Sequence, residues 1–192
     1  MRLAGLSSIL VLLATACGVA EGGSRPGRKA FQADDPTAGR PAQPLEGVTL
    51  DGGRFRLSEH RGDIVVLVFH RGPHCGICRE RLRALASNAP RYAALDARVV
   101  AVVPGPADAW ADIVDADDIE IPVVVADRRT LERWGVWRRG AALPDPAAFV
   151  VDPRGRIRYR HVGTTAADRV GDIVLLAAAR RVHAPPARAV GR

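Results

Sequence analysis

The sequence of 192 residues contains little cysteine, little lysine and few aromatic residues. Three cysteines are too few for a small secreted scaffold that is held together by disulfides. Aromatic residues make up 5% of the chain, too few for a surface that stacks single-stranded nucleic acid on aromatic rings. Apolar residues are abundant, at 47% of the chain, which excludes a disordered protein. The length then predicts one domain with a single core, together with terminal segments.

Positive charge comes almost entirely from arginine, because Lys29 is the only lysine among 28 basic residues. The formal net charge of +7 lies mainly at the two ends of the chain. Between Pro44 and Arg180, 20 arginines face 18 aspartates and glutamates, which leaves this part nearly neutral. A nucleic-acid-binding domain needs a basic stripe on a folded face. We therefore expect no nucleic-acid partner.

The N-terminal segment predicts export. Arg2 precedes an uncharged apolar run from Leu3 to Ala14, which is typical of a signal peptide and is shorter than the roughly 20 residues of a membrane span. The letters LATACG at residues 13–18 resemble a bacterial lipoprotein box, in which a lipidated cysteine becomes the new N-terminus. This resemblance implies a signal peptide at residues 1–16 and a lipid on Cys17 that anchors the protein to the membrane. Ordinary signal cleavage that leaves a spare thiol is the alternative.

Two further segments are expected to flank the folded domain. Residues 17–43 are rich in glycine, proline, serine, arginine and aspartate without apolar periodicity, which predicts a flexible tether with a reach of about 30 Å. Residues 183–192 include two adjacent prolines and are expected to fray. The folded domain is predicted over residues 44–182.

Within that domain, apolar runs alternate with helical segments. The run IVVLVF at residues 64–69 predicts a central strand that is buried on both faces. Other strands are predicted at 48–50, 55–57, 99–103, 123–125, 148–151 and 157–162, and helices at 76–87, 90–95, 107–114, 130–134 and 168–182. This order predicts an α/β fold in which helices flank a central mixed sheet.

A CxxC motif, Cys75 and Cys78, lies directly between the 64–69 strand and the helix that follows it. Unpaired amides and the positive dipole end at a helix N-terminus stabilise a thiolate, which predicts Cys75 as a nucleophile with a lowered pKa. Cys78, one turn along, can attack a mixed disulfide on Cys75 and is predicted to be the resolving thiol. His74, Arg71 and Arg79 add positive charge and are expected to shape the site.

Three other uses of the cysteine pair are less well supported. A structural disulfide across so short a loop removes only about 2 kcal/mol of unfolded-state entropy. A zinc site needs two more ligands at a suitable spacing, whereas His60, His70 and His161 are scattered along the chain. A reduced pair without a role does not suit an exported protein. The pattern therefore favours redox chemistry.

The run from Leu45 to about Val182 resembles the thioredoxin-like fold, in its alkyl hydroperoxide reductase / thiol-specific antioxidant (redoxin) branch. The matching stretches are LDGGRFRLSEHRGDIVVLVFHRGPHCGICRERLRAL, IPVVVADRRTLERWGV and LPDPAAFVVDPRGRIRYRHVG. In such proteins a cis-proline loop lies against the active disulfide, which implies a cis peptide bond before Pro146; an ordinary trans proline is the alternative. The resemblance implies no metal or organic cofactor.

The motif departs from two patterns of related proteins. Typical peroxiredoxins carry Pro-x-x-x-Thr/Ser-x-x-Cys, in which the hydroxyl helps to position the peroxide. Here Gly72 lies three residues before Cys75, and Cys75 lies three before Cys78, so neither cysteine follows that hydroxyl. Thioredoxins usually carry an aromatic residue before the first cysteine, and this chain has His74 at that position. His74 is expected to make Cys75 more acidic and the disulfide more oxidising.

These patterns predict an enzyme, a thiol–disulfide oxidoreductase that acts on protein thiols or disulfides together with a redox partner. One alternative is a thiol-dependent peroxidase, in which peroxide oxidises Cys75 to a sulfenate that condenses with Cys78. Another is a copper(I)-binding chaperone module, although such modules are often rich in methionine and this chain has one. The predicted location is the cell envelope, as a lipoprotein on the periplasmic face or cell surface, or otherwise the periplasm or medium.

Overall fold

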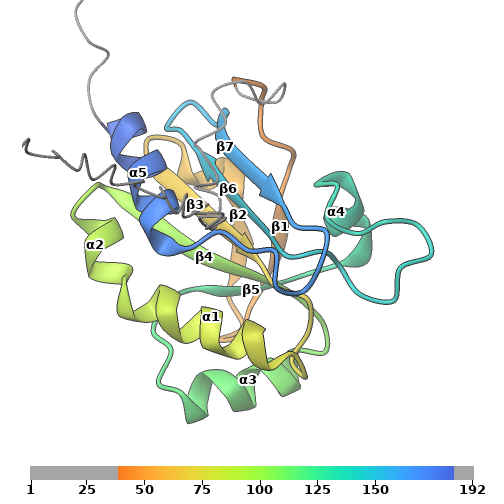
Figure 1. The fold of residues 1–192 in the computed structure, drawn as a ribbon. Helices are drawn as coiled ribbons and strands as arrows, with labels where there is room; N and C mark the ends of the chain where they lie inside the picture. Colours follow the sequence, from red (N-terminus) through yellow and green to blue (C-terminus); the bar gives the residue numbers. More distant parts are fainter. Residues whose placement is uncertain (1–38, 184–192) are drawn as a thin grey trace, which may run out of the picture. The chain divides into compact units, whose positions relative to one another are not determined.

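The computed structural model describes residues 39–183, which form a seven-stranded sheet with helices on both faces (Figure 1). The strands are β1 (Glu46–Thr49), β2 (Arg54–Arg56), β3 (Ile64–Phe69), β4 (Ala97–Pro104), β5 (Val123–Ala126), β6 (Ala147–Val151) and β7 (Ile157–Val162). The helices are α1 (Gly76–Ser87), α2 (Ala89–Ala93), α3 (Ala107–Ala116), α4 (Arg128–Arg133) and α5 (Asp172–His183), with a 3-10 helix at Leu57–His60.

The sheet is mixed, as predicted, and its order is β2-β1-β5-β4-β3-β6-β7. Strands β3, β4 and β5 run parallel, whereas β6 pairs antiparallel with both β3 and β7. The β1–β2 hairpin extends the other edge by antiparallel pairing with β5. The predicted α/β class with a central mixed sheet and flanking helices is therefore confirmed.

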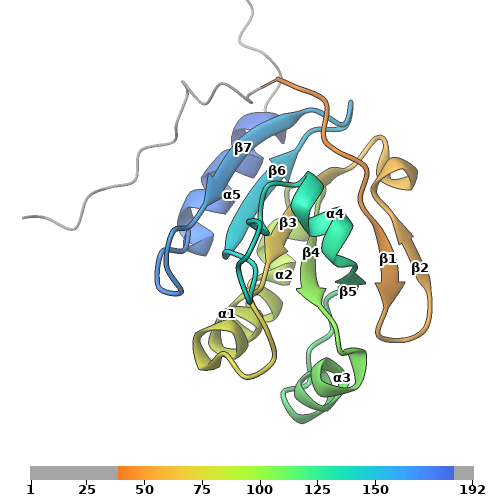
Figure 2. The ribbon, with the colours of Figure 1, turned by 90° about the vertical axis from the view of Figure 1, so that its right-hand side faces the viewer.

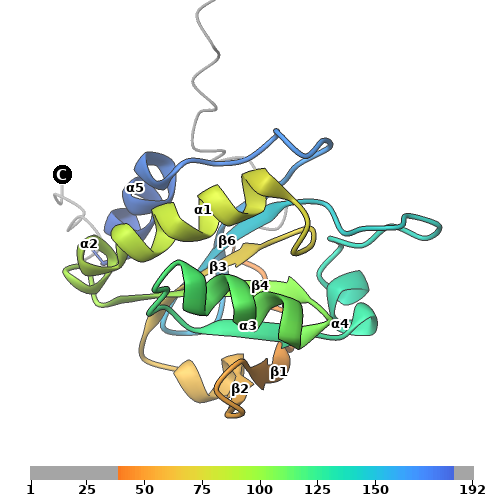
Figure 3. The same ribbon diagram turned by 90° about the horizontal axis from the view of Figure 1, so that it is seen from below.

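Strand β3 is central because both of its faces are apolar. All six of its residues are buried, and their side chains divide alternately between two clusters, with Val66 in one and Leu67 in the other. The first cluster includes buried residues of α1, α2, α3 and α5, and the second includes Leu131 of α4. Figure 2 shows α4 across the sheet from α1, and Figure 3 shows α1 between α5 and α3.

A buried ion pair connects α1 to α5. Arg81 of α1 lies 2.5 Å from a carboxylate oxygen of Asp172, and both side chains are at most 10% exposed. The hydroxyl of Tyr92 donates to the other oxygen of the same carboxylate at 2.6 Å. Because a buried charge is costly without a partner, this contact fixes the start of α5 against α1.

Most elements begin and end within two residues of their predicted bounds, and two differences are larger. Helix α5 begins at Asp172 rather than at 168, because Asp168 instead closes a turn: its carboxylate accepts the backbone N–H of Thr164 at 3.1 Å. At the other end, part of the predicted tether packs on the domain. The N–H of Gly39 donates to Ile157 at 2.7 Å, and that of Ala42 donates to Gly155 at 2.9 Å.

Several predictions concern residues outside the described range. The signal peptide at 1–16, Cys17, the tether up to residue 38 and the tail beyond residue 183 all lie outside it. Within residues 39–183, no helix has the length and apolar character that crossing a bilayer requires.

Candidate active site

The cysteine pair lies where β3 passes into α1. Cys75 is the residue that precedes α1, with an extended backbone, and Cys78 lies in the first helical turn. The carbonyl of Cys75 accepts the N–H of Cys78 at 2.8 Å, which starts the helix between the two side chains. Cys75 is partly exposed, whereas Cys78 is 0% exposed. Only the Cys75 sulfur is therefore open to a large substrate.

A residue that the sequence did not indicate approaches both sulfurs. Arg169, in the connection between β7 and α5, places its Nη2 atom 3.1 Å from the Sγ of Cys78 and 3.7 Å from the Sγ of Cys75. The backbone N–H of Arg71 also donates to the Cys78 sulfur, at 3.4 Å. The buried sulfur thus receives two donors. Arg169 is 91 residues from Cys78 along the chain, so no local motif could have predicted this contact.

The predicted lowering of the Cys75 pKa is wrong. Burial and the hydrogen bond with the Cys78 side chain raise the pKa of Cys75 above its ordinary value of 9.0, and the backbone N–H of Cys78 and the positive charge of Arg169 only partly oppose them. A helix N-terminus was expected to lower it, but burial has the larger effect here. His74 is exposed, and it is not among the groups that shift the pKa of Cys75.

The two arginines of the motif form contacts of their own. Arg79 makes a two-pronged contact with the carboxylate of Asp117, with both distances at 2.6 Å. Hydrogen bonds from Arg79 and Arg83 hold the pKa of Asp117 well below its usual range. The Arg71 side chain donates to the carbonyl of Pro144 at 3.2 Å. Arg79 therefore fastens α1 to the end of α3, and Arg71 fastens the motif to the segment before β6.

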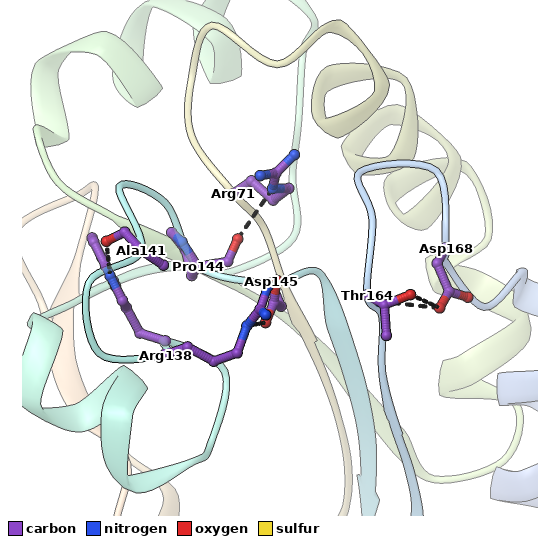
Figure 4. A network of polar contacts seen from close by, with 8 residues as sticks. Arg71, Arg138, Ala141, Pro144, Asp145, Thr164 and Asp168 are labelled. Carbon is purple, nitrogen blue, oxygen red and sulfur yellow. Dashed lines mark hydrogen bonds and ion pairs between the residues drawn. The ribbon is translucent and has the colours of Figure 1, made fainter.

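The segment between α4 and β6 is held beside the motif by its own contacts (Figure 4). Arg138 pairs with Asp145 at 2.7 and 3.0 Å, and Figure 4 also shows the bond from Arg71 to Pro144. Leu143 in this segment is 45% exposed, and Ile77 of α1 is 43% exposed. The motif and the segment bonded to it thus each present one exposed apolar side chain.

The cis peptide bond predicted before Pro146 is not present. Among residues 39–183 the cis bond lies between Gly105 and Pro106, just before α3, and Pro146 is trans. Pro146 leads directly into β6, and its carbonyl accepts the N–H of Gly163 at 2.7 Å. A trans proline suits this place, because a strand does not need an N–H from the residue before its first pairing. Pro146 still lies near the site, since it lines a small cavity together with Arg169.

A buried histidine lies behind the motif. His70 follows β3, is 1% exposed, and neither ring nitrogen has a hydrogen-bond partner among the described residues. Its ring contacts Trp110 edge to face, with centroids 6.0 Å apart. Burial, followed by the charges of Arg169 and Arg81, lowers the pKa of His70 to about 3, so the ring is neutral. No group of three or more His, Cys, Asp or Glu side chains suited to a metal occurs in residues 39–183.

The AhpC/TSA family profile matches residues 38–160 of the chain, which agrees with the resemblance noted in the sequence. This match includes both cysteines and Pro146, and it ends before Arg169. No curated protein sequence matches the chain.

Solved structures similar to this chain include two peroxide-related proteins and one thioredoxin-family protein. Peroxidoxin BcpB from Mycobacterium tuberculosis has a TM-score of 0.65 at 20% identity, covering 76% of this chain and 97% of that one. Peroxiredoxin Q from Xanthomonas campestris has a TM-score of 0.64 at 15% identity, covering 73% and 92%. A thiol:disulfide interchange protein from Chlorobium tepidum has a TM-score of 0.61 at 19% identity, covering 79% and 100%. This likeness confirms the predicted thioredoxin-like fold.

Proposed function

The chain belongs to the AhpC/TSA family, which gives it a redox function at thiols, and we propose that it is a thiol–disulfide oxidoreductase. Cys75 is the nucleophile and Cys78 the resolving thiol. The observation that carries this assignment is the difference in exposure at the start of α1: Cys75 is partly exposed, and Cys78 is 0% exposed. A substrate disulfide can therefore reach the first sulfur, while the second can react only within the protein.

Each step of this reaction exchanges one sulfur–sulfur bond for another. Cys75 loses its proton to solvent and attacks the substrate disulfide, which breaks and releases one substrate thiolate. Cys78 then loses its proton and attacks the Cys75 sulfur, and the second substrate thiolate leaves. Two electrons pass from the protein to the substrate, and the protein keeps a Cys75–Cys78 disulfide. The reverse sequence oxidises a substrate dithiol, and the partner's reduction potential sets the direction.

The surroundings of Cys75 favour a polypeptide substrate. Ile77 and Leu143 are exposed apolar side chains, one in the helix turn after Cys75 and the other in the segment bonded to Arg71. Exposed apolar side chains beside a reactive group are typical of a surface that binds another protein. The contacts of Arg138 with Asp145 fix the shape of that segment, and the bond from Arg71 to Pro144 holds it to the motif, so the surface is prepared before the substrate binds.

A thiol peroxidase is the second candidate, because a guanidinium lies beside the sulfurs. Arg169 could stabilise negative charge on a peroxide oxygen as Cys75 attacks it, the O–O bond breaks and water leaves. Cys78 would then attack the sulfenate sulfur and release a second water. The site lacks the hydroxyl that helps to position the peroxide in typical peroxiredoxins, because the residue three before Cys75 is Gly72.

Stopped-flow measurements on the reduced full-length chain separate these two functions. We expect the protein to reduce a protein disulfide such as insulin much faster than a free thiol does, and to react with hydrogen peroxide no faster than a free thiol. Cys75→Ser serves as the matched control and should abolish the reaction with insulin. A fast reaction with peroxide and a slow one with insulin would replace the oxidoreductase by the peroxidase.

We also propose that the domain works in the cell envelope, attached through a lipid on Cys17. This part of the proposal is supported by the sequence of residues 1–17 alone. Mass spectrometry of the mature N-terminus tests it: a diacylglyceryl-modified Cys17 is expected, and Cys17→Ser should release the protein from membranes. An unmodified N-terminus in the wild-type protein would contradict the anchor.

A further inference from the structure

The two sulfurs of the pair have unequal surroundings. Cys78 is 0% exposed and its Sγ receives two donors, the Nη2 of Arg169 at 3.1 Å and the N–H of Arg71 at 3.4 Å. Cys75 lies farther from the guanidinium, at 3.7 Å, and is partly exposed. Hydrogen bonds from a charged donor stabilise an anionic acceptor most strongly, so this arrangement favours negative charge on the buried sulfur.

Arg169 is held in place by its own loop. Its Nε atom donates to the carbonyl of Ala166 at 2.7 Å. Asp168, the preceding residue, accepts the N–H of Thr164 at 3.1 Å and pairs with His161 at 3.2 Å. The guanidinium is therefore directed at the sulfurs before any substrate binds. Because it is already in place, little free energy is spent on rearranging it when negative charge develops on a sulfur.

The charge of Arg169 is also available to the sulfurs. Among the described residues, Arg79, Arg81 and Arg138 each form an ion pair with a carboxylate, whereas none of the ion pairs of this part of the chain involves Arg169. Its side chain is half-buried, where a charge acts more strongly than in water. The natural counter-ion for this guanidinium is a thiolate.

We propose that Arg169 stabilises the negative charge that Cys78 carries as it attacks Cys75, and thereby accelerates this second step of the exchange. This inference rests on the proposed oxidoreductase function. When Cys75 has formed a mixed disulfide with the substrate, Cys78 loses its proton beside the guanidinium and attacks the Cys75 sulfur. The Cys75–substrate bond breaks and the substrate sulfur leaves with the electron pair. The mixed disulfide is therefore short-lived.

The contact also affects the stability of the disulfide. The guanidinium can stabilise a thiolate of the reduced pair, and it loses that partner once the disulfide forms. Arg169 thus stabilises the reduced pair relative to the disulfide, which makes the disulfide a stronger oxidant.

Stopped-flow reaction with 4,4′-dithiodipyridine, an uncharged disulfide, resolves the two steps. One thiopyridone is released when Cys75 attacks and a second when Cys78 resolves. The full chain carries Cys17→Ser so that the pair alone gives the signal, and the reagent is concentrated enough for the first phase to outrun the second. In Arg169→Gln we expect the second phase to slow by roughly tenfold or more, as for loss of one charged hydrogen bond, and the first by less than about twofold.

Two further variants and a second measurement make this result specific. Arg180→Gln removes the same charge from an exposed position on α5 and should leave both phases unchanged. Arg169→Lys keeps the charge and should restore part of the second phase. The equilibrium with glutathione gives an independent readout: in Arg169→Gln it should shift roughly tenfold toward the protein disulfide. The unfolding midpoint of each variant shows whether it is folded. If Arg169→Gln is not folded, the rates of Arg169→Lys are compared with those of the wild type instead.

The outcomes separate this inference from the function on which it rests. A second phase in Arg169→Gln that matches the wild type, or an unchanged glutathione equilibrium, would overturn the role of Arg169. If the wild-type pair released a single thiopyridone, and Cys78→Ser behaved identically, the oxidoreductase itself would be wrong. Equal slowing of both phases in Arg169→Gln would also contradict the inference, since it would mean that the guanidinium serves Cys75 as much as Cys78.

Discussion

The two segments that meet at the sulfurs are specified in different ways. The connection from β3 to α1 carries its chemistry in consecutive letters, with both cysteines within one helical turn. The connection from β7 to α5 contributes Arg169, which has no neighbouring motif and reaches the site only because α5 packs beside α1. The difference teaches that the first segment determines which atoms react, while the second determines how charge is shared between them. Substitutions in each segment should therefore affect different steps.

The largest effect is expected in the first segment. Cys75→Ser removes the accessible sulfur of the pair and should lower turnover with a protein disulfide by at least about 1,000-fold. Cys78→Ser should also stop turnover, but it leaves the first attack intact, so a stable mixed disulfide should accumulate on the protein. Insulin reduction, followed by non-reducing electrophoresis, measures both. Full turnover by Cys75→Ser would show that the two segments do not cooperate as described.

The contact between the helices that carry the two segments should have the next largest effect. Asp172→Asn leaves the charge of Arg81 buried without its carboxylate, and we expect the free energy of unfolding to fall by about 3 kcal/mol. Urea denaturation measures this loss. Asp112→Asn, an exposed position on α3, is the matched control and should change stability by less than about 0.5 kcal/mol. Equal stabilities would mean that the ion pair does not hold α5 against α1.

The pH dependence of alkylation tests the charge distribution between the segments. Because burial raises the pKa of Cys75 above its ordinary value of 9.0, its thiolate fraction should still be rising at pH 9. Iodoacetamide should therefore react with the reduced pair more than about tenfold faster near pH 9 than near pH 7. The buried Cys78 does not contribute, and Cys17→Ser removes the third thiol. A plateau near pH 7 would show instead that Cys75 carries the thiolate.

The smallest effect is expected from the loop that orients Arg169. Asp168→Ala removes the carboxylate that holds Thr164 and His161, at a cost of about 1 kcal/mol to the loop. The second phase with dithiodipyridine should slow by about three- to fivefold, less than in Arg169→Gln. Asp127→Ala loses a comparable contact, the 2.7 Å cap on Thr130, far from the sulfurs along the chain and should not change this phase. If Asp127→Ala slowed the second phase more than Asp168→Ala does, the loop around Arg169 would not be what sets the rate of that phase.

Much of the fold could be predicted from local patterns. Strand β3 at Ile64–Phe69 and helix α1 at Gly76–Ser87 have the predicted bounds, because an unbroken apolar run and a helical periodicity identify them without outside help. The start of α5 was predicted four residues too early. Asp168 suits the first turn of a helix in sequence, but its carboxylate instead closes a turn with Thr164.

The site was only partly predictable for the same reason. The cysteine pair and its position at the start of α1 follow from consecutive residues, whereas the guanidinium of Arg169 approaches through a tertiary contact. The early helix start also placed Arg169 inside a predicted helix rather than in a loop that faces the sulfurs. The pKa of Cys75 was misjudged because the helix dipole can be read from sequence but burial cannot. The cis bond before Pro146 was predicted from the family resemblance, whereas the peptide bond before Pro146 is trans.

The most direct test of the central claim is the identity of the trapped intermediate. The reduced Cys78→Ser chain, incubated with a protein disulfide and digested without reductant, should yield one mixed disulfide by mass spectrometry, and that bond should join Cys75 to the substrate cysteine. This result is predicted because Cys75 is partly exposed and Cys78 is 0% exposed. If Cys75→Ser instead traps the substrate on Cys78, or if Cys78→Ser forms no adduct, the assignment of nucleophile and resolving thiol is contradicted.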